Sequence, residues 1–273
     1  MYSGSTLTNI SGNILGFHQK MDRSSRTSLC KLDPKHSSSF PSKKLILHFE
    51  GKNGPDGIKS KSTGKHEPWH FYDPFDPSDG TLIDLIDEHY TNLVSELNSG
   101  NQERAAFEAS WLAHAIIDGL TPAHHYPFEE ELEKLRGESK ETRDSVLKKI
   151  FIPGETYREI AKNNWKMWGS KGLFTTHALF EWGAAMIAVT LPSNIAMPSQ
   201  YDIKKAQQIG ISEFFKRTAR DIALMHMYEN FYKKGWTPKL ANQVRKDLAP
   251  KMAKTVTLAW YLALQESSNS STS

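Results

Sequence analysis

Apolar residues recur at helical spacing along much of this chain. Between residues 103 and 120 they return every three or four positions, and the segment holds no Pro and no Gly before Gly119, which predicts a buried helix. Gly119 supplies a helix stop, and Pro122 prevents the helix from continuing. A second helix is expected over 81–97, with Asp79 as its cap and a leucine-rich face toward the core.

The same spacing predicts helices through most of the remaining chain. They are expected at 18–32, 128–149 with a break at Gly137, 152–170, 174–190, 203–215, 213–233 and 238–264. Segment 43–49 is apolar but of uncertain type, and 51–68 is rich in Gly, Lys and Ser and predicts a loop. We find no repeat and no hairpin pattern. The chain is therefore expected to be all-α: a single-domain multi-helix bundle over 18–265, after a flexible N-terminal arm (1–17) and before a disordered tail (266–273).

Composition narrows the classes of protein to consider. The 273 residues suit one large domain or two small ones, and 38% of them are hydrophobic, which is enough for a core. A formal net charge of +3 fits polyanionic substrates without requiring them. The single cysteine, Cys30, excludes an intrachain disulfide. No apolar run approaches the ~20 residues of a membrane span, and no signal peptide is recognisable. The default expectation is a cytoplasmic protein, with non-classical export left open.

Candidate chemistry is concentrated in 111–127, WLAHAIIDGLTPAHHYP. His114 and Asp118 are four residues apart and share one helix face, and His124 and His125 follow in the turn. Imidazole and carboxylate at such spacing suit a divalent metal of the zinc kind. The competing interpretation is a set of core residues that satisfy one another. Burying such groups without partners costs about 2–7 kcal/mol each, more for a charge, which favours a metal.

A second pair repeats this spacing. His177 and Glu181, in THALFEW, are again four residues apart on an apolar helix. Helical bundles build metal sites by directing such pairs toward a shared core. A purely structural ion pair is the alternative. A third patch, HEPWHFYDPFDPSDG, places His70 between aromatic residues in a loop.

These motifs, in this order, resemble a known family. HAIIDGLTPAH, WHFYDP and HALFE look like the signatures of the zinc-dependent phospholipases C and of the zinc-dependent single-strand nucleases of fungi and plants, and the resemblance covers roughly residues 18–190. It implies an all-α bundle around a buried cluster of zinc ions. The ligands that it implies are Asp56, His70, His114 and Asp118 for one Zn²⁺, His124, His177 and Glu181 for a second, and Asp118 with His18 for a third.

The chain departs from the family pattern at its N-terminus, in the residues expected to cradle choline, and in the long segment between His124 and His177. The family's third zinc also uses the amino group and carbonyl of an N-terminal Trp, and this chain has no Trp near its start. His48 and His66 are further candidates for ligands of this third zinc. Because the third site departs from the family pattern, two or three Zn²⁺ per chain are expected. Gly57 and Glu67 stand where the phospholipases carry aromatic residues that cradle choline. A preference for choline lipids is therefore not carried over.

The resemblance implies a metal-dependent hydrolase that cleaves phosphodiesters with a zinc-activated water, with Asp56 orienting that water or taking its proton. The partner would be a phospholipid or a single-stranded nucleic acid. The alternative is a non-catalytic zinc-binding helical scaffold or binding protein descended from the family. A metal-free protein whose His and acidic residues form core ion pairs is a further alternative.

Overall fold

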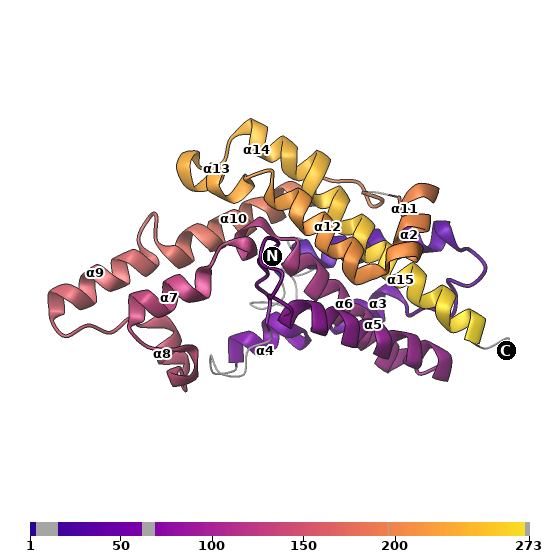
Figure 1. Ribbon diagram of the computed structural model, residues 1–273, viewed down its shortest axis with the longest axis horizontal. Coiled ribbons are helices and arrows are strands. Elements are labelled where there is room, and N and C mark those ends of the chain that lie inside the picture. Colours follow the sequence, from indigo (N-terminus) through magenta and orange to yellow (C-terminus); the bar gives the residue numbers. More distant parts are fainter. Residues whose placement is uncertain (4–15, 62–68, 196, 271–273) are drawn as a thin grey trace.

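The computed structural model describes residues 1–3, 16–61, 69–195 and 197–270, and all regular structure in these residues is helical. The helices form one body (Figure 1), which confirms the predicted all-α fold. Its centre is an antiparallel pair, α5 (Thr81–Ser99) and α6 (Gln102–Gly119). Gly100 ends α5 in the left-handed region at φ 72°, and the Asn101 side chain caps α6.

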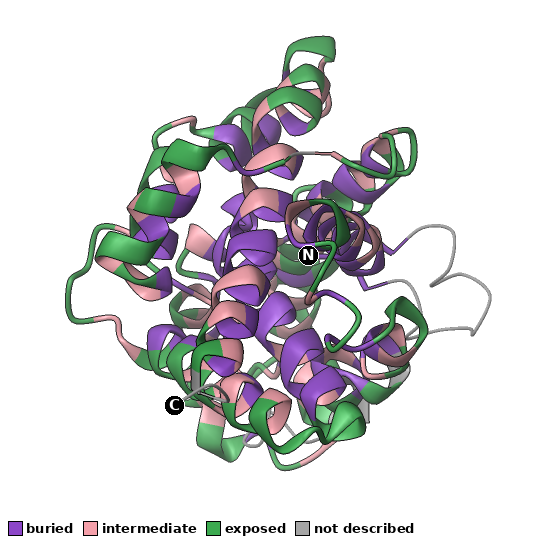
Figure 2. Cartoon of the chain, turned by 90° about the vertical axis from the view of Figure 1, so that its right-hand side faces the viewer, coloured by how far each residue is buried: buried purple, intermediate pink, exposed green. Residues whose placement is uncertain are grey.

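Two further long helices, α2 (Phe17–Leu32) and α15 (Ala249–Ser270), pack against each other, and α15 also packs against α5 and α6. The other α-helices are α3 (Lys43–His48), α4 (Pro55–Lys61), α7 (Phe128–Arg136), α8 (Val146–Ile150), α9 (Tyr157–Trp168), α10 (Leu173–Val189), α11 (Gln200–Ile209), α12 (Ile211–Ala223), α13 (Met227–Lys234) and α14 (Pro238–Gln243). Buried positions line the inside of the body and exposed positions its outside (Figure 2).

The core is closely packed around the middle and the C-terminal end of α6. Trp260 of α15 is fully buried, and its indole N–H donates to the carbonyl of Ala109 at 3.0 Å. At the C-terminal end of α6, a Cβ added to Gly119 would lie 2.4 Å from Leu82 and 2.5 Å from Phe215. The glycine therefore lets side chains of α5 and α12 pack closely against the end of α6.

Helices α7, α8 and α9 gather at one end of the long axis of the molecule (Figure 1). Phe128, Leu132, Ile152 and Met167 form a small apolar cluster of their own there. From α9 the chain returns through α10, which carries His177 and Glu181 toward the centre. Among the described helices, none has both the length and the apolar character that crossing a bilayer requires.

Two details differ from the sequence-based expectation. Asp79 does not cap α5: Gly80 is the N-cap, because the Asp79 carboxylate instead accepts the backbone N–H of Asp73 at 2.8 Å. The predicted loop 51–68 contains α4, a helix that packs against the turn Gly51–Asn53.

The structure also differs from the prediction at both ends of the chain. The tail was predicted to be disordered over 266–273, but α15 continues to Ser270; Glu266 accepts a hydrogen bond from Tyr90 at 3.1 Å, and Ser267 is buried. Residues 4–15 of the predicted arm, and 271–273, lie outside the described part. Met1 and Ser3, however, are buried, with exposed fractions of 2% and 1%.

Candidate metal centre

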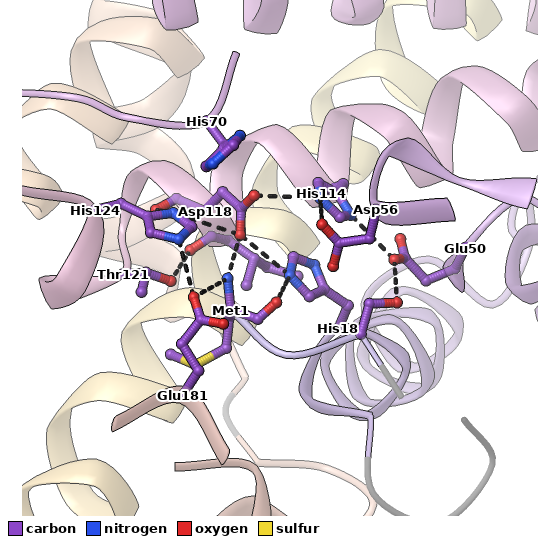
Figure 3. A network of polar contacts seen from close by, with 12 residues as sticks. Met1, His18, Glu50, Asp56, His70, His114, Asp118, Thr121, His124 and Glu181 are labelled. Atoms are coloured by element: carbon purple, nitrogen blue, oxygen red, sulfur yellow. Dashed lines mark hydrogen bonds and ion pairs between the residues drawn. The ribbon is translucent and has the colours of Figure 1, made fainter. Parts of the chain in front are cut away.

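The side chains predicted as metal ligands meet between α2, α6 and α10. Helix α6 supplies His114 and Asp118, and the 3-10 turn Pro122–His125 that follows it supplies His124. His18 comes from the first turn of α2, Asp56 from the first turn of α4, and His177 with Glu181 from the middle of α10. Figure 3 shows most of these groups directed toward one another around Asp118.

Asp118 is the hub of the cluster. One oxygen, Oδ1, contacts the amino nitrogen of Met1 and lies 3.2 Å from Nε2 of His18, while Oδ2 lies 3.2 Å from Nε2 of His114. Its side chain is only 3% exposed. Burial opposes the charged carboxylate, but the Met1 ammonium, His124 and His114 outweigh burial and hold the pKa of Asp118 well below its usual value.

Met1 is buried inside the cluster. The Met1 amino nitrogen contacts Asp118 and lies 3.2 Å from Oε1 of Glu181, and the Met1 carbonyl lies 2.8 Å from Nε2 of His18. Burial disfavours this ammonium, but the carboxylates of Asp118, Glu181 and Asp56 raise its pKa to about 10. A backbone amine and carbonyl therefore stand beside His18 and Asp118 without an N-terminal Trp.

His124, His177 and Glu181 form a second group beside Asp118. Glu181 Oε1 lies 2.9 Å from Nε2 of His124 and 3.1 Å from Nε2 of His177, and the two imidazoles stack with their centroids 5.0 Å apart. His124 Nδ1 faces the backbone carbonyl of Asp118 at 3.0 Å, which directs Nε2 at Glu181. Burial lowers the pKa of His124 to about 3, so its ring is neutral and able to bind a metal at ordinary pH.

Glu50 completes the site, and sequence reasoning missed it. Its Oε1 accepts from Nδ1 of His114 at 3.0 Å and from Ser3 Oγ at 3.0 Å. Although burial opposes the charge, His114 lowers the pKa of Glu50 to about 2, so the carboxylate is ionised and only accepts. The His114 Nδ1 is therefore the donor, and Nε2 is left to face Asp118. This arrangement is the usual way in which a carboxylate orients a metal-binding imidazole.

Asp56 and His70 lie at the outer side of the cluster. Asp56 Oδ1 is 3.8 Å from Nε2 of His114, and its side chain is 23% exposed. Burial, with repulsion from Asp118, raises the pKa of Asp56 above its usual value despite the opposing effect of His114. The His70 ring lies 5.1 Å from that of His124, and its Nε2 contacts the Lys59 ammonium at 2.8 Å. Lys59 is a further site residue that the sequence did not indicate.

The geometry fits a cluster of divalent metal ions. Ligand atoms of a tetrahedral zinc ion lie roughly 3.3–3.4 Å apart, since each is about 2.0–2.1 Å from the metal. The contacts of Glu181 with Met1, His124 and His177, and those of Asp118 with His18 and His114, are 2.9–3.2 Å long, slightly shorter than that separation. The described residues contain two groups of potential ligands, His18/Glu50/His114 and His124/His177/Glu181. Within each group the potential ligand atoms lie within 4.8 Å of one another.

The charges support the same interpretation. Asp118, Glu181 and Asp56 are carboxylates gathered around one ammonium, and mutual repulsion between buried carboxylates is costly unless cations offset it. A divalent ion bound among these groups would remove this cost. We conclude that the residues present could hold a metal ion.

The remaining histidines of the motif regions lie apart from the cluster. His125 turns its Nε2 to the carbonyl of Gly119 at 2.8 Å, and His48 is exposed. The further candidate His66 lies outside the described residues. All eight predicted ligands thus lie in or beside one cluster, to which the structure adds Met1, Glu50 and Lys59. No family model matches the chain, and the searches of curated proteins and of solved structures find no match either.

Proposed function

We propose that this protein is a metal-dependent hydrolase of phosphodiesters. The observation that carries the proposal is the bridging position of Asp118, whose two oxygens face different sets of nitrogen atoms. A carboxylate so placed holds two cations close together, as in the two-metal sites that cleave phosphate esters, where the ions are about 3.5–4 Å apart. The order of the three sequence motifs supports the same reaction class.

Each part of the cluster would have its own task. His114, His70 and Asp56 would hold one ion, and His18 with the amino and carbonyl groups of Met1 would hold another, with Asp118 between them. His124, His177 and Glu181 would hold a further ion. Bound zinc supplies Lewis acidity, which offsets charge on phosphoryl oxygens and makes a water acidic enough to attack at neutral pH.

Asp56 is the best candidate for handling the proton of the attacking water. It is the most exposed of the three clustered carboxylates, at 23% against 3% for Asp118 and 15% for Glu181. Its raised pKa favours proton uptake, as a general base requires. Lys59, one turn further along α4, is placed to neutralise a phosphoryl oxygen once His70 is engaged with a metal.

A groove beside the cluster offers room for the organic part of the substrate. It has a volume of about 670 Å³ and is lined by His114, Ile58, Leu85, Trp69 and Trp111. The indole N–H groups of Trp69 and Trp111 are buried without a hydrogen-bond partner in the protein, so they remain available to an acceptor on a ligand. Apolar walls with a few polar groups are typical of small-molecule sites. The groove supports catalysis over a purely structural zinc site, which is closed.

The test is hydrolysis of bis(p-nitrophenyl) phosphate by zinc-loaded protein, followed by single-stranded DNA and phospholipid vesicles as substrates. Asp56→Asn should lower kcat by roughly 10²–10⁴. Asp221→Asn, which changes an exposed carboxylate on α12, is the matched control and should leave the rate unchanged. Bound zinc with no hydrolysis of any of the three substrates would instead favour the non-catalytic scaffold.

A further inference from the structure

Helix α10 is apolar on two opposite faces. Its inner face carries the candidate ligands His177 and Glu181 together with the buried Phe180, Ala184 and Ala188. Its outer face carries a second apolar stripe. These residues, with their exposed fractions, are Leu179 (43%), Trp182 (53%), Met186 (49%) and Val189 (39%). A helix that is apolar around its whole circumference is normally buried on all sides. We therefore expect a binding partner to cover the outer stripe of α10.

The outer stripe continues into a groove between α10 and α13. The groove has a volume of about 620 Å³, and Leu179, Trp182, Met186, Phe231 and Trp236 contribute to its apolar lining. A Cβ added to Gly183 would lie 2.1 Å from the Trp236 indole nitrogen. Helix α10 is therefore held tightly against Trp236, and the groove is a fixed feature of the fold.

Lysines line the same groove. Lys171, Lys233 and Lys234 contribute to its wall and are exposed to solvent. From residue 160 to residue 190 the only acidic residue is Glu181, and its side chain faces the metal centre. Tyr232, 51% exposed, lies among the lysines. Exposed aliphatic and aromatic side chains thus share one face with positive charge. We call Leu179, Trp182, Met186, Tyr232 and the three lysines the α10–α13 face.

We propose that the α10–α13 face docks on a membrane surface that carries anionic phospholipids. Trp and Tyr favour the boundary between headgroups and acyl chains, and apolar residues beside lysines are typical of proteins that lie on anionic membranes. The lysines supply attraction to anionic headgroups, and the outer stripe of α10 supplies the apolar area that enters the interface. Helix α10 contacts both α9 and α13 (Figure 1).

The observations favour a membrane over the two other occupants of such a face. A second copy bound across a two-fold axis would bring the same surface against itself, and the lysines of the two chains would repel one another. A single-stranded nucleic acid could use Trp182 and Tyr232 for stacking, but the aliphatic Leu179, Met186 and Val189 would gain nothing from it. Only a lipid interface satisfies the apolar stripe and the charge together.

The test is co-sedimentation with vesicles of phosphatidylcholine containing phosphatidylserine, and with vesicles of phosphatidylcholine alone. This inference goes beyond the proposed function and does not depend on it, because bound protein is measured whether or not any lipid is cleaved. The wild type should bind the anionic vesicles more tightly, and salt should weaken that binding. Lys233→Gln with Lys234→Gln should weaken it roughly 30-fold, since each lysine contributes about fivefold.

Trp182→Ala with Met186→Ala should weaken binding to anionic vesicles at least ~10-fold through lost apolar burial. Two control pairs lie on α11 and α12 or just after: Lys204→Gln with Lys216→Gln for charge, and Tyr201→Ala with Leu224→Ala for exposed apolar area. Both controls should bind as the wild type does. Melting curves show that each variant folds.

The proposal is overturned if the folded wild type does not bind anionic vesicles. It is also overturned if the control pairs weaken binding as much as the pairs in the face. Sedimentation of the free protein as a dimer that the Trp182→Ala/Met186→Ala variant disrupts, or retention of single-stranded DNA in place of vesicles, would assign the face to another occupant.

Discussion

The substitution Asp118→Asn distinguishes a metal centre from a set of core ion pairs. If Asp118 binds metal, zinc should increase the loss of stability that the substitution causes, whereas in a metal-free protein zinc should not change that loss. The substitution keeps the size of the side chain and removes its charge. In the metal-free protein it removes the main partner of the Met1 ammonium and leaves it with Glu181 at 3.2 Å. Breaking a buried ion pair in this way costs about 3–5 kcal/mol.

The expected shift in melting temperature follows from the size of the chain. For a domain of this length 1 kcal/mol moves Tm by about 2 °C, so the metal-free variant should melt roughly 6–10 °C below the metal-free wild type. Zinc held a thousandfold above its Kd stabilises the folded state by about 4.1 kcal/mol for each site. The difference between wild type and variant should therefore widen by roughly 8 °C in zinc for each ion that the variant fails to bind.

Differential scanning calorimetry in chelator and in excess zinc measures all four values. Asp202→Asn is the control, because Asp202 belongs to the capping box of α11, whose N-cap is Ser199, and pairs with Lys254 at 3.0 Å, away from the cluster. Its effect on Tm should be small and equal in the two conditions. If the Asp118→Asn difference is the same with and without zinc, Asp118 does not bind the metal and the metal-free account is correct.

Three further changes test individual contacts. Glu50→Gln removes the carboxylate that orients His114 and should lower zinc affinity about 10–100-fold, measured by competition with a chromogenic chelator; unchanged affinity would exclude this role. Asp22→Asn should stabilise the protein at pH 7 by about 1–3 kcal/mol, because both oxygens of this buried side chain lack a partner. Burial, followed by Glu50, raises the pKa of Asp22 well above its usual value, so the folded state holds the proton more tightly than the unfolded state. Wild-type stability from Asp22 is therefore lost as pH rises above about 3.8, and the advantage of the variant in urea unfolding should grow from pH 4 to pH 7; a constant or negative difference would contradict this. A glycine added before Met1 turns the amine into an amide and should remove one zinc per chain by elemental analysis, whereas an unchanged content would show that the amine is not a ligand.

The helical fold and most of the ligands could be predicted because they depend on local spacing. His114 with Asp118, and His177 with Glu181, are each one helical turn apart, so the periodicity that predicts the helix also predicts that the pair shares a face. The neighbouring Gly119 and Pro122 mark the turn that brings His124 back to Asp118.

The remaining site residues depend on contacts between distant segments. Glu50 lies 64 residues before His114, and nothing near it in the sequence distinguishes it from a surface glutamate. Met1 lies 117 residues from Asp118, and Lys59 belongs to α4, which forms in a segment whose Gly, Lys and Ser content predicts a loop. Tertiary packing decides these positions, and it also extends α15 into the predicted polar tail, where Tyr90 donates a hydrogen bond to Glu266.

The most direct test of the central claim is the zinc content per chain of protein purified without added metal, for the wild type and for Asp118→Asn. Because the two oxygens of Asp118 face separate groups of ligands, we expect two or three zinc ions in the wild type and a loss of at least one in the variant. A wild type without bound zinc, whose melting temperature is unchanged by chelator, would contradict the account.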